Sequence, residues 1–309
     1  MADLKTKYMG LELRSPIIAG SCGLTSDVEK MVEMEKAGVG AVVLKSIFEE
    51  QINEETSGVF KAGYGMGDAY PEAEDYIKAY IRSNTIQKYV ELVRNAKSRL
   101  TIPVIASVNC FSGGEWVSFA RQLEEAGADA LELNVFILPV NEFRESAEVE
   151  NVYFEIVKSI KSQIKIPVSV KISHYFTNLS AFVDKIKAYG ANATTLFNRF
   201  YEPDININTL EMGAASVFST AAELRTTLRW TGILAGKDKR LEISASTGVH
   251  GGEAAVKLLL AGATTVQVCS VLYEKGIHVI EDINNFIGKW MDSKAFKTIE
   301  DYRGMLSYS

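Results

Sequence analysis

The sequence predicts an α/β protein in which eight parallel strands close into a (β/α)8 barrel, also called a TIM barrel. Eight short apolar runs rich in β-branched residues alternate with longer amphipathic stretches along the 309 residues. Such alternation is typical of a parallel sheet covered by helices. The length also fits, because a closed barrel of eight such units typically takes about 250 residues. A doubly wound open sheet is the alternative that the same pattern allows.

The expected strands are the apolar runs themselves. They cover residues 16–21, 40–45, 102–108, 128–134, 167–172, 193–198, 241–246 and 264–269. The amphipathic stretches that follow them are expected to form helices that end near residues 36, 99, 125, 164, 189, 229, 261 and 291. Residues 4–13 predict an additional N-terminal β-hairpin that turns at Met9 and Gly10 and closes the bottom of the barrel. The two longest loops, after the second and sixth strands, fall on the face that carries the chemistry in a barrel.

Glycines mark the ends of several expected helices. Gly38, Gly127 and Gly262 each follow an alanine and stand between a helix and the next strand. A glycine adopts the left-handed backbone conformation that ends a helix at little cost. No linker or low-complexity segment interrupts the alternation, so residues 1–309 are expected to form a single domain.

The composition argues against several classes of function. The formal net charge is -6, whereas a protein whose main partner is nucleic acid needs a surplus of Lys and Arg. The three cysteines, Cys22, Cys110 and Cys269, form no C-x-x-C pair, so we expect neither a bound metal nor a disulfide framework. The N-terminus lacks the apolar segment of a signal peptide, and no apolar run approaches the ~20 residues of a spanning helix. We therefore expect a cytoplasmic protein that binds neither nucleic acid nor a membrane.

Polar residues end nearly every expected strand, at the face where barrel enzymes hold their substrates. In chain order they are Ser21, Lys45, Asn109, Asn134, Lys171, Asn198, Thr247, Cys269 and Ser270. Some of these residues can also be read as ordinary helix caps. Lys45 and Lys171 differ from the others because each follows an apolar strand run. An ammonium group in the mouth of a barrel needs an anionic or electron-rich partner to offset its lost hydration, so these lysines indicate a ligand site.

The most specific stretch lies between residues 243 and 272. Two expected strands end there in small residues directly before helices, with Thr247 and Gly248 after one strand and Ser270 after the other. In a barrel, the loops after the last two strands form a cradle of backbone N–H groups for a phosphate. His250, in the same loop, is either an anion contact or a helix-cap residue. The stretch predicts a site for a phosphorylated cofactor or substrate, and the alternative is an ordinary turn rich in Gly and Ser.

Six segments together match the pattern of a known family: 15–21, 42–46, 131–134, 168–171, 243–272 and 299–306. On these segments the chain resembles the dihydroorotate dehydrogenase family, and within it the class 1 cytosolic branch, over nearly its whole length. The last segment, Ile-Glu-Asp-Tyr-Arg-Gly-Met-Leu, is informative because nothing general about barrels demands it. The resemblance implies a homodimeric FMN barrel that transfers a hydride between FMN and a small-molecule substrate with a dihydropyrimidine-like ring.

The resemblance also implies roles for individual residues. Those that would bind FMN are Ser21, Lys45, Lys171, Gly213, Gly248, Val249, Cys269 and Ser270. Lys171 would approach the edge of the flavin where negative charge develops on reduction, and a fixed cation there stabilises the reduced flavin. Asn134 and Asn198 match two of the asparagines that bind the pyrimidine substrate.

The catalytic loop departs from the family pattern. The Cys or Ser that accepts a proton from the substrate in the family falls at Ile137, which accepts none. One further substrate asparagine is replaced by Pro139, and another falls near Gly65. Cys110 and His174 are the candidates for a replacement catalytic base. Their alternative readings are a small buried residue and a solvated loop histidine, respectively.

Three functions are consistent with these residues. The first is an FMN-dependent oxidoreductase acting on CH–CH bonds of dihydroorotate or a related ring. The second is an FMN-binding barrel that does not turn over dihydroorotate, because Ile137 replaces the usual base. The third is a phosphosugar aldolase or isomerase in which Lys171 or Lys45 forms a Schiff base, and the family match at 299–306 ranks it last. The electron acceptor is left open: fumarate fits the simplest branch, whereas NAD needs a partner subunit because the chain has no cysteine cluster for an iron–sulfur centre.

Overall fold

Eight parallel strands close into a barrel in the computed structural model, which describes residues 2–48, 71–109, 113–135, 137, 140–199 and 203–308. The barrel strands are β3 (Ile17–Ala19), β4 (Ala41–Val43), β6 (Val104–Asn109), β7 (Ala130–Asn134), β8 (Val168–Ile172), β9 (Ala193–Leu196), β12 (Glu242–Ala245) and β13 (Thr265–Val268). Each pairs in parallel with the next, and β13 pairs with β3, so the ring is closed. The closed ring confirms the predicted barrel and excludes the open sheet. A short strand, β5 (Ile47–Phe48), also pairs with β6.

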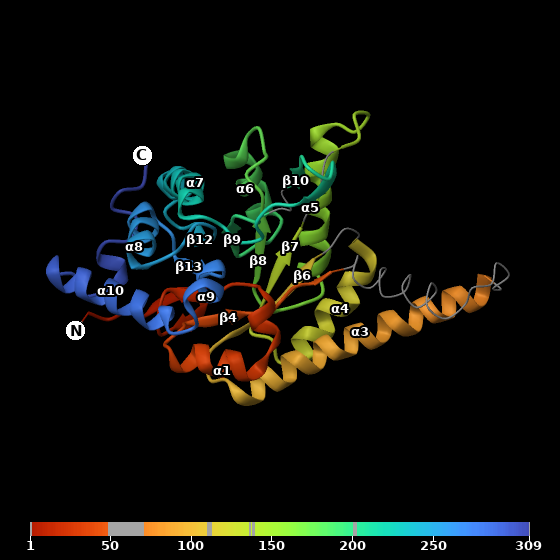
Figure 1. Cartoon of the computed structure of the whole chain (residues 1–309), viewed down its shortest axis with the longest axis horizontal. Coiled ribbons are helices and arrows are strands. Elements are labelled where there is room, and N and C mark those ends of the chain that lie inside the picture. The colour runs from red at the N-terminus through yellow and green to blue at the C-terminus, as the bar shows by residue number, and fades with distance from the viewer. Residues whose placement is uncertain are drawn as a thin grey trace.

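Helices cover the outside of the barrel (Figure 1). They are α1 (Val28–Lys36), α3 (Pro71–Arg99), α4 (Gly113–Glu125), α5 (Ser146–Lys161), α6 (Leu179–Ala188), α7 (Leu224–Lys237), α8 (Gly252–Ala261), α9 (Ser270–Lys275) and α10 (Val279–Ser293), with short 3-10 turns η1 (Gly23–Ser26), η2 (Ala221–Glu223) and η3 (Ile299–Asp301). Gly38, Gly127 and Gly262 have φ angles of 93°, 97° and 116°, which confirms the predicted left-handed helix ends. No helix in the described ranges is long and apolar enough to span a membrane.

Helix α7 is longer than the sequence predicts. The apolar spacing predicts an end near residue 229, but the helix continues to Lys237 through Gly232 and Gly236. The C-terminal tail packs against both glycines. A Cβ atom on Gly232 would lie 2.9 Å from the ring of Tyr308, and one on Gly236 would lie 1.6 Å from the Tyr308 backbone oxygen. These glycines therefore make room for the tail and do not mark the end of the helix.

The N-terminal hairpin closes one end of the barrel, as predicted. Strands β1 (Thr6–Tyr8) and β2 (Leu11–Leu13) pair antiparallel around a turn at Met9 and Gly10. Tyr8 is fully buried, and its hydroxyl donates to Ser169 Oγ inside the barrel at 3.1 Å. The Met9 N–H donates to the Glu242 carboxylate at the start of β12. The hairpin therefore covers this end of the barrel, and the opposite end, where the strands finish, is the one open to ligands.

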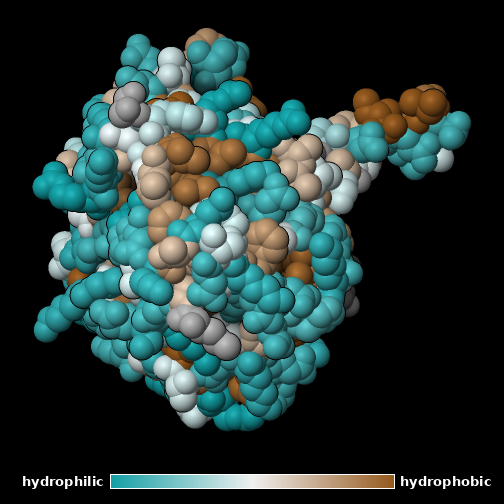
Figure 2. Space-filling view, turned by 90° about the vertical axis from the view of Figure 1, so that its left-hand side faces the viewer, coloured by the Kyte–Doolittle hydropathy of each residue, from teal (hydrophilic) through white to brown (hydrophobic). Residues whose placement is uncertain are grey.

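A second hairpin, which the sequence analysis treats as a loop, follows the sixth barrel strand. Strands β10 (Pro203–Asn206) and β11 (Glu211–Ala214) pair antiparallel and make no other sheet contact among the described strands. Four of the hairpin's apolar side chains are 62% to 84% exposed: Ile205, Ile207, Leu210 and Met212. Figure 2 shows hydrophobic side chains at the end of an arm that projects from the body of the molecule. Because its strands are short and unburied, the alternation of polar and apolar residues there gives only a weak signal in the sequence.

Candidate functional site

A cavity of about 400 Å³ opens where the barrel strands finish. Its walls come from the segments that follow β3, β9, β12 and β13, from β8 and β13 themselves, and from the loop before η2. The lining residues are Ser21, Cys22, Lys171, Phe197, Asn198, Arg199, Val217, Phe218, Ser219, Ser246, Thr247, Gly248, Val249, Gln267, Cys269, Ser270 and Tyr273. The volume is within the range of about 300–1,000 Å³ that ligand pockets occupy. Strand ends far apart in the sequence therefore share one pocket.

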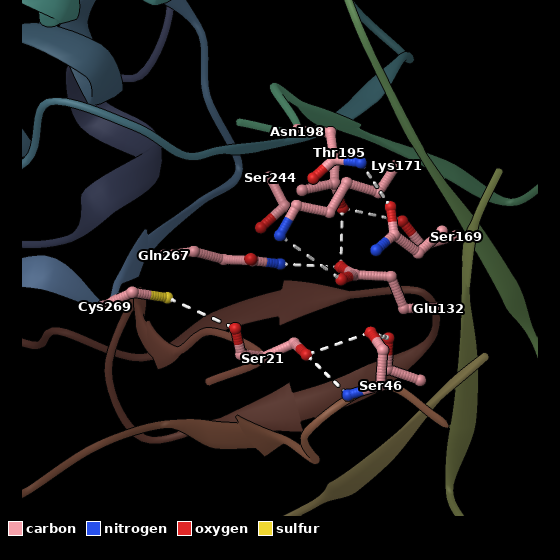
Figure 3. Close-up of polar contacts among 12 residues, drawn as sticks. Ser21, Ser46, Glu132, Ser169, Lys171, Thr195, Asn198, Ser244, Gln267 and Cys269 are labelled. Atoms are coloured by element: carbon pink, nitrogen blue, oxygen red, sulfur yellow. Dashed lines mark hydrogen bonds and ion pairs between the residues drawn. The ribbon is translucent and has the colours of Figure 1, made fainter. Parts of the chain in front are cut away.

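Lys171 lies in this cavity next to a buried carboxylate. Its side chain, from β8, is only 9% exposed, and its Nζ atom lies 3.9 Å from Glu132 Oε1 in β7. Glu132 Oε2 accepts hydrogen bonds from Thr195 Oγ1 and Gln267 Nε2, each at 2.8 Å (Figure 3). Glu132 and Gln267 were missed in the sequence analysis. The sequence did carry a signal for them, because each is a polar residue inside an apolar strand. Inward and outward positions alternate along a barrel strand, so such a residue can point into the barrel.

Polar groups converge at another part of the cavity, at the ends of β12 and β13. Ser219 Oγ lies 3.1 Å from Ser270 Oγ and 3.4 Å from both Gly248 N and His250 Nε2. Gly248 has a φ angle of 78°, and a Cβ atom there would lie 2.2 Å from the Leu224 backbone nitrogen. Only glycine fits this approach. The result is a cluster of hydroxyl, backbone and imidazole groups where the sequence predicts a phosphate site.

His250 is held by an acidic partner on α9. Its Nδ1 atom lies 3.1 Å from Glu274 Oε2, and Lys275 Nζ donates to the His250 backbone oxygen at 2.9 Å. A carboxylate on one ring nitrogen fixes the orientation of the imidazole. The other nitrogen then faces Ser219, inside the polar cluster.

The two predicted substrate asparagines lie together. Asn198 Nδ2 donates to Asn134 Oδ1 at 2.7 Å, and Asn198 lines the cavity. Asn134 is buried at the end of β7. Arg199, also in the cavity wall, donates from Nε to Glu223 Oε2 at 3.0 Å and from Nη1 to the Ser216 oxygen at 2.7 Å.

Several other predicted site residues lie away from the cavity wall. Lys45 follows β4, is exposed, and does not line the cavity. Gly213 lies in the exposed strand β11, so the structure does not bring it to the cavity either. His174 is exposed, with its ring 4.2 Å from that of Tyr175 and 5.7 Å from that of Phe197, a cavity residue. Desolvation by the neighbouring side chains lowers the pKa of His174. Cys110 lies outside the described residues.

Ile137 occupies the position of the family's proton acceptor. It is partly buried and packs against the hydrophobic core. Its backbone takes part in a hydrogen bond with the Tyr153 side chain, and burial raises the pKa of Tyr153 to about 12. Neither group accepts a proton near neutral pH. Among the described residues, no three His, Cys, Asp or Glu side chains gather into a metal site.

Comparison with known proteins decides the family. A profile described as dihydroorotate dehydrogenase matches residues 3–291. The chain belongs to the dihydroorotate dehydrogenase family. It is therefore a member of a family of FMN-dependent oxidoreductases that act on CH–CH bonds, as the resemblance in its strand-end segments predicts.

Curated relatives cover the chain almost from end to end. It is 30% identical to a protein of Thermoplasma acidophilum named dihydroorotate dehydrogenase B (NAD(+)), catalytic subunit, over 99% of both chains. Proteins of the same name from Thermoplasma volcanium and Pyrococcus furiosus are 27% and 26% identical, over 99% and 98% of both chains. At these identities the barrel is shared, while individual substrate contacts are free to differ.

The cavity fits FMN on three observations. The cluster around Ser219 and Gly248 offers hydroxyl and N–H donors near α9, as a phosphate requires. Lys171 supplies a nearly buried cation to the same cavity, and Gln267 Oε1, a buried cavity atom, has no hydrogen-bond partner within the described part of the chain. A buried polar atom without a partner is rare, and it points to a ligand donor in this space.

Proposed function

We propose that the protein is an FMN-dependent oxidoreductase that transfers a hydride between FMN and a dihydropyrimidine-like ring, dihydroorotate or a related compound. The observation that carries this proposal is the position of Lys171, a nearly buried cation in the same cavity as the polar cluster around Ser219. The names of the relatives support the substrate class.

We propose roles for the cavity residues from the family resemblance, and their positions in the cavity support these roles. Gly248, Val249, Cys269 and Ser270 would hold the phosphate, and Ser219 and His250 would extend this donor set. Ser21 and Lys171 would contact the ring system. When bound, FMN supplies a reversible acceptor of two electrons. Lys171 would stabilise the negative charge that develops on reduction, because a fixed cation in a water-poor cavity acts strongly on nearby charge.

The substrate would lie against the amide pair of Asn134 and Asn198. This pair offers both donors and acceptors to a polar ring, and buried polar groups reject compounds that leave them unpaired. His174 and Cys110 remain the proposed proton acceptors.

A second function is favoured by one observation: Ile137 leaves the usual position of the base without a proton acceptor. In that case the chain binds FMN but does not oxidise dihydroorotate.

We also propose that residues 1–309 form one FMN-binding domain in a cytoplasmic homodimer. The exposed apolar side chains of the β10–β11 hairpin support dimerisation, because contiguous apolar surface is costly to leave in water. The relatives named as catalytic subunits support the addition of a partner subunit that passes electrons to NAD.

The experiment begins with FMN uptake, followed through the visible absorbance of the flavin. The loaded protein is then mixed without oxygen with dihydroorotate, dihydrouracil and related rings, and bleaching of the flavin is recorded. Bleaching by one of these rings supports the oxidoreductase. Stable flavin binding without bleaching by any of them favours the second function, and a protein that takes up no FMN contradicts both.

A further inference from the structure

Two cysteines lie side by side in the wall of the cavity. Strands β3 and β13 pair in parallel with Ala19 opposite Val268, and the Gly20 N–H donates to the Val268 oxygen at 2.9 Å. Cys22 and Cys269 follow these two strands. The chain therefore brings together two thiols that are 247 positions apart in the sequence. Both are free cysteines, and both line the cavity.

The local packing directs the Cys269 thiol toward the loop that carries Cys22. Cys269 Sγ lies 3.8 Å from the backbone oxygen of Ser21, the residue before Cys22 (Figure 3). A Cβ atom on Gly20 would lie 2.5 Å from Cys269 Sγ, so glycine at this position leaves the space that the sulfur occupies. Cys22 and Cys269 are close enough for each thiol to shift the pKa of the other.

The surroundings of the two sulfurs differ. Cys22 caps η1, and its side chain accepts from the backbone N–H of Thr25. The Tyr273 hydroxyl and the Leu24 backbone also hydrogen-bond to Cys22. These hydrogen-bond donors stabilise a thiolate. Cys269, in contrast, keeps its proton more tightly, because the neighbouring Cys22 and burial raise the pKa of its thiol.

We propose that Cys22 and Cys269 form a redox-active dithiol that closes to an intramolecular disulfide in the wall of the cofactor cavity. Cys22 is the attacking residue and Cys269 is the resolving residue. The inference rests on the two thiols and not on the identity of the substrate, so it is tested independently of the proposed function.

The oxidant in this reaction is a low-molecular-weight disulfide. The Cys22 thiolate attacks one of its sulfurs, forms a mixed disulfide and releases one thiolate. The Cys269 thiol then loses its proton and attacks Cys22 Sγ, which releases the second small thiol. In sum, two protein thiols and one small disulfide give one protein disulfide and two small thiols. Two electrons pass from the protein to the small disulfide.

The test treats the full-length Cys110→Ser variant, with only Cys22 and Cys269 remaining, with glutathione disulfide and records its intact mass. The expected product has lost the mass of two hydrogen atoms, carries no glutathione, and returns to the starting mass with dithiothreitol. The matched variant Cys110→Ser/Cys269→Ser is expected to keep one glutathionyl group, because the resolving thiol is missing. In Cys110→Ser/Cys22→Ser, we expect the reaction to slow at least about tenfold, since the stabilised thiolate is gone.

A second measurement needs no variant. After oxidation of the wild-type protein and proteolysis under acid conditions, we expect a cross-linked peptide that joins Cys22 to Cys269. Glutathione that remains on the Cys110→Ser variant, or a wild-type disulfide that involves Cys110 instead, would overturn the proposal.

Discussion

Glu132 Oε1 lies 3.9 Å from Lys171 Nζ, and both side chains point into the barrel from neighbouring strands. The strand register places Glu132 opposite Ser169 and Asn134 opposite Lys171, so the lysine reaches back along the barrel axis toward the carboxylate. Glu132 is 1% exposed. The attraction between the two opposite charges offsets the hydration that each loses on burial. The ion pair thereby holds the Lys171 ammonium at the inner end of the cavity.

Breaking this pair is expected to destabilise the fold. In Glu132→Gln the Lys171 ammonium loses its anionic partner, and removing one member of a buried pair costs about 3–5 kcal/mol. The double variant Glu132→Gln/Lys171→Met removes both charges and should recover much of that loss. Urea unfolding measures the free energies. Glu253→Gln, which removes the exposed carboxylate of the Lys257 pair, is the control and should change little. A stability of Glu132→Gln equal to that of the control would refute the role of the pair.

Replacing the lysine alone tests its part in flavin chemistry. In Lys171→Met we expect flavin reduction to slow by roughly 10²-fold, because the cation that stabilises developing negative charge is gone. FMN affinity should fall much less, since the polar cluster around Ser219 is intact. Stopped-flow bleaching gives the rate, and fluorescence titration gives the FMN dissociation constant. Lys187→Met, at an exposed pair with Asp238, serves as the matched control. An unchanged reduction rate would remove Lys171 from the mechanism.

Much of the barrel was predictable from the sequence because strand and helix signals repeat eight times. The N-terminal hairpin and the left-handed glycines at Gly38, Gly127 and Gly262 were also predictable, since their backbone chemistry is local. The β10–β11 hairpin was missed because its short strands bury nothing. The end of α7 was missed because the glycines there make room for Tyr308, a residue that is distant in the sequence.

The candidate site was predictable only in part. Lys171, Gly248 and Ser270 were identified because they interrupt strong local patterns at strand ends. Glu132 and Gln267 were not identified. Each is a polar residue within an apolar strand, and the sequence alone does not tell whether such a side chain points into the barrel or away from it. The contact between Cys22 and Cys269 depends on the pairing of the first and last strands, which no local pattern reports.

Restoring a proton acceptor at position 137 is predicted to raise activity on dihydroorotate. In Ile137→Cys a thiol returns to the family position, and we expect reduction of the flavin by dihydroorotate to rise by roughly 10²-fold, the usual contribution of a general base. Ile137→Ala is the matched control, because it opens similar space without a proton acceptor. Anaerobic stopped-flow measurements compare the two. Equal rates in the Cys and Ala variants would mean that another residue accepts the proton.

The β10–β11 hairpin is predicted to form the dimer contact. Leu210 is 84% exposed and has a φ angle of 55°, a conformation that aspartate tolerates better than leucine. Leu210→Asp should therefore keep the hairpin but weaken dimerisation by roughly tenfold or more, since loss of a central hot-spot side chain costs about 2 kcal/mol or more. Sedimentation velocity over a concentration series measures the dissociation. Met305→Asp, at an exposed residue of the C-terminal tail, is the control. Equal dissociation constants in both variants would place the interface elsewhere.

The reactivity of Cys22 should depend on pH, and the midpoint of this dependence should reflect the hydrogen bonds that its neighbours make to the thiolate. The hydrogen bond from Cys269, with help from the Leu24 and Thr25 backbone and the Tyr273 hydroxyl, lowers the pKa of Cys22 to about 6. The reactive thiolate exists above this pKa. Alkylation of Cys22 by iodoacetamide should therefore rise as the pH increases through about 6 and level off above it.

Tyr273→Phe removes one donor to the thiolate, so the midpoint of that pH profile should move upward. In the Cys110→Ser background, Cys269→Ala should move it further, because the Cys269 hydrogen bond is the largest cause of the shift. Lys171 and Glu132 are the charged groups that act on the partner thiol Cys269, with opposite signs, and neither variant changes them. Peptide mass spectrometry of alkylated samples gives the rate at each pH. A midpoint near 8.5, the value of an ordinary cysteine, in the Cys110→Ser protein would contradict the thiolate at Cys22.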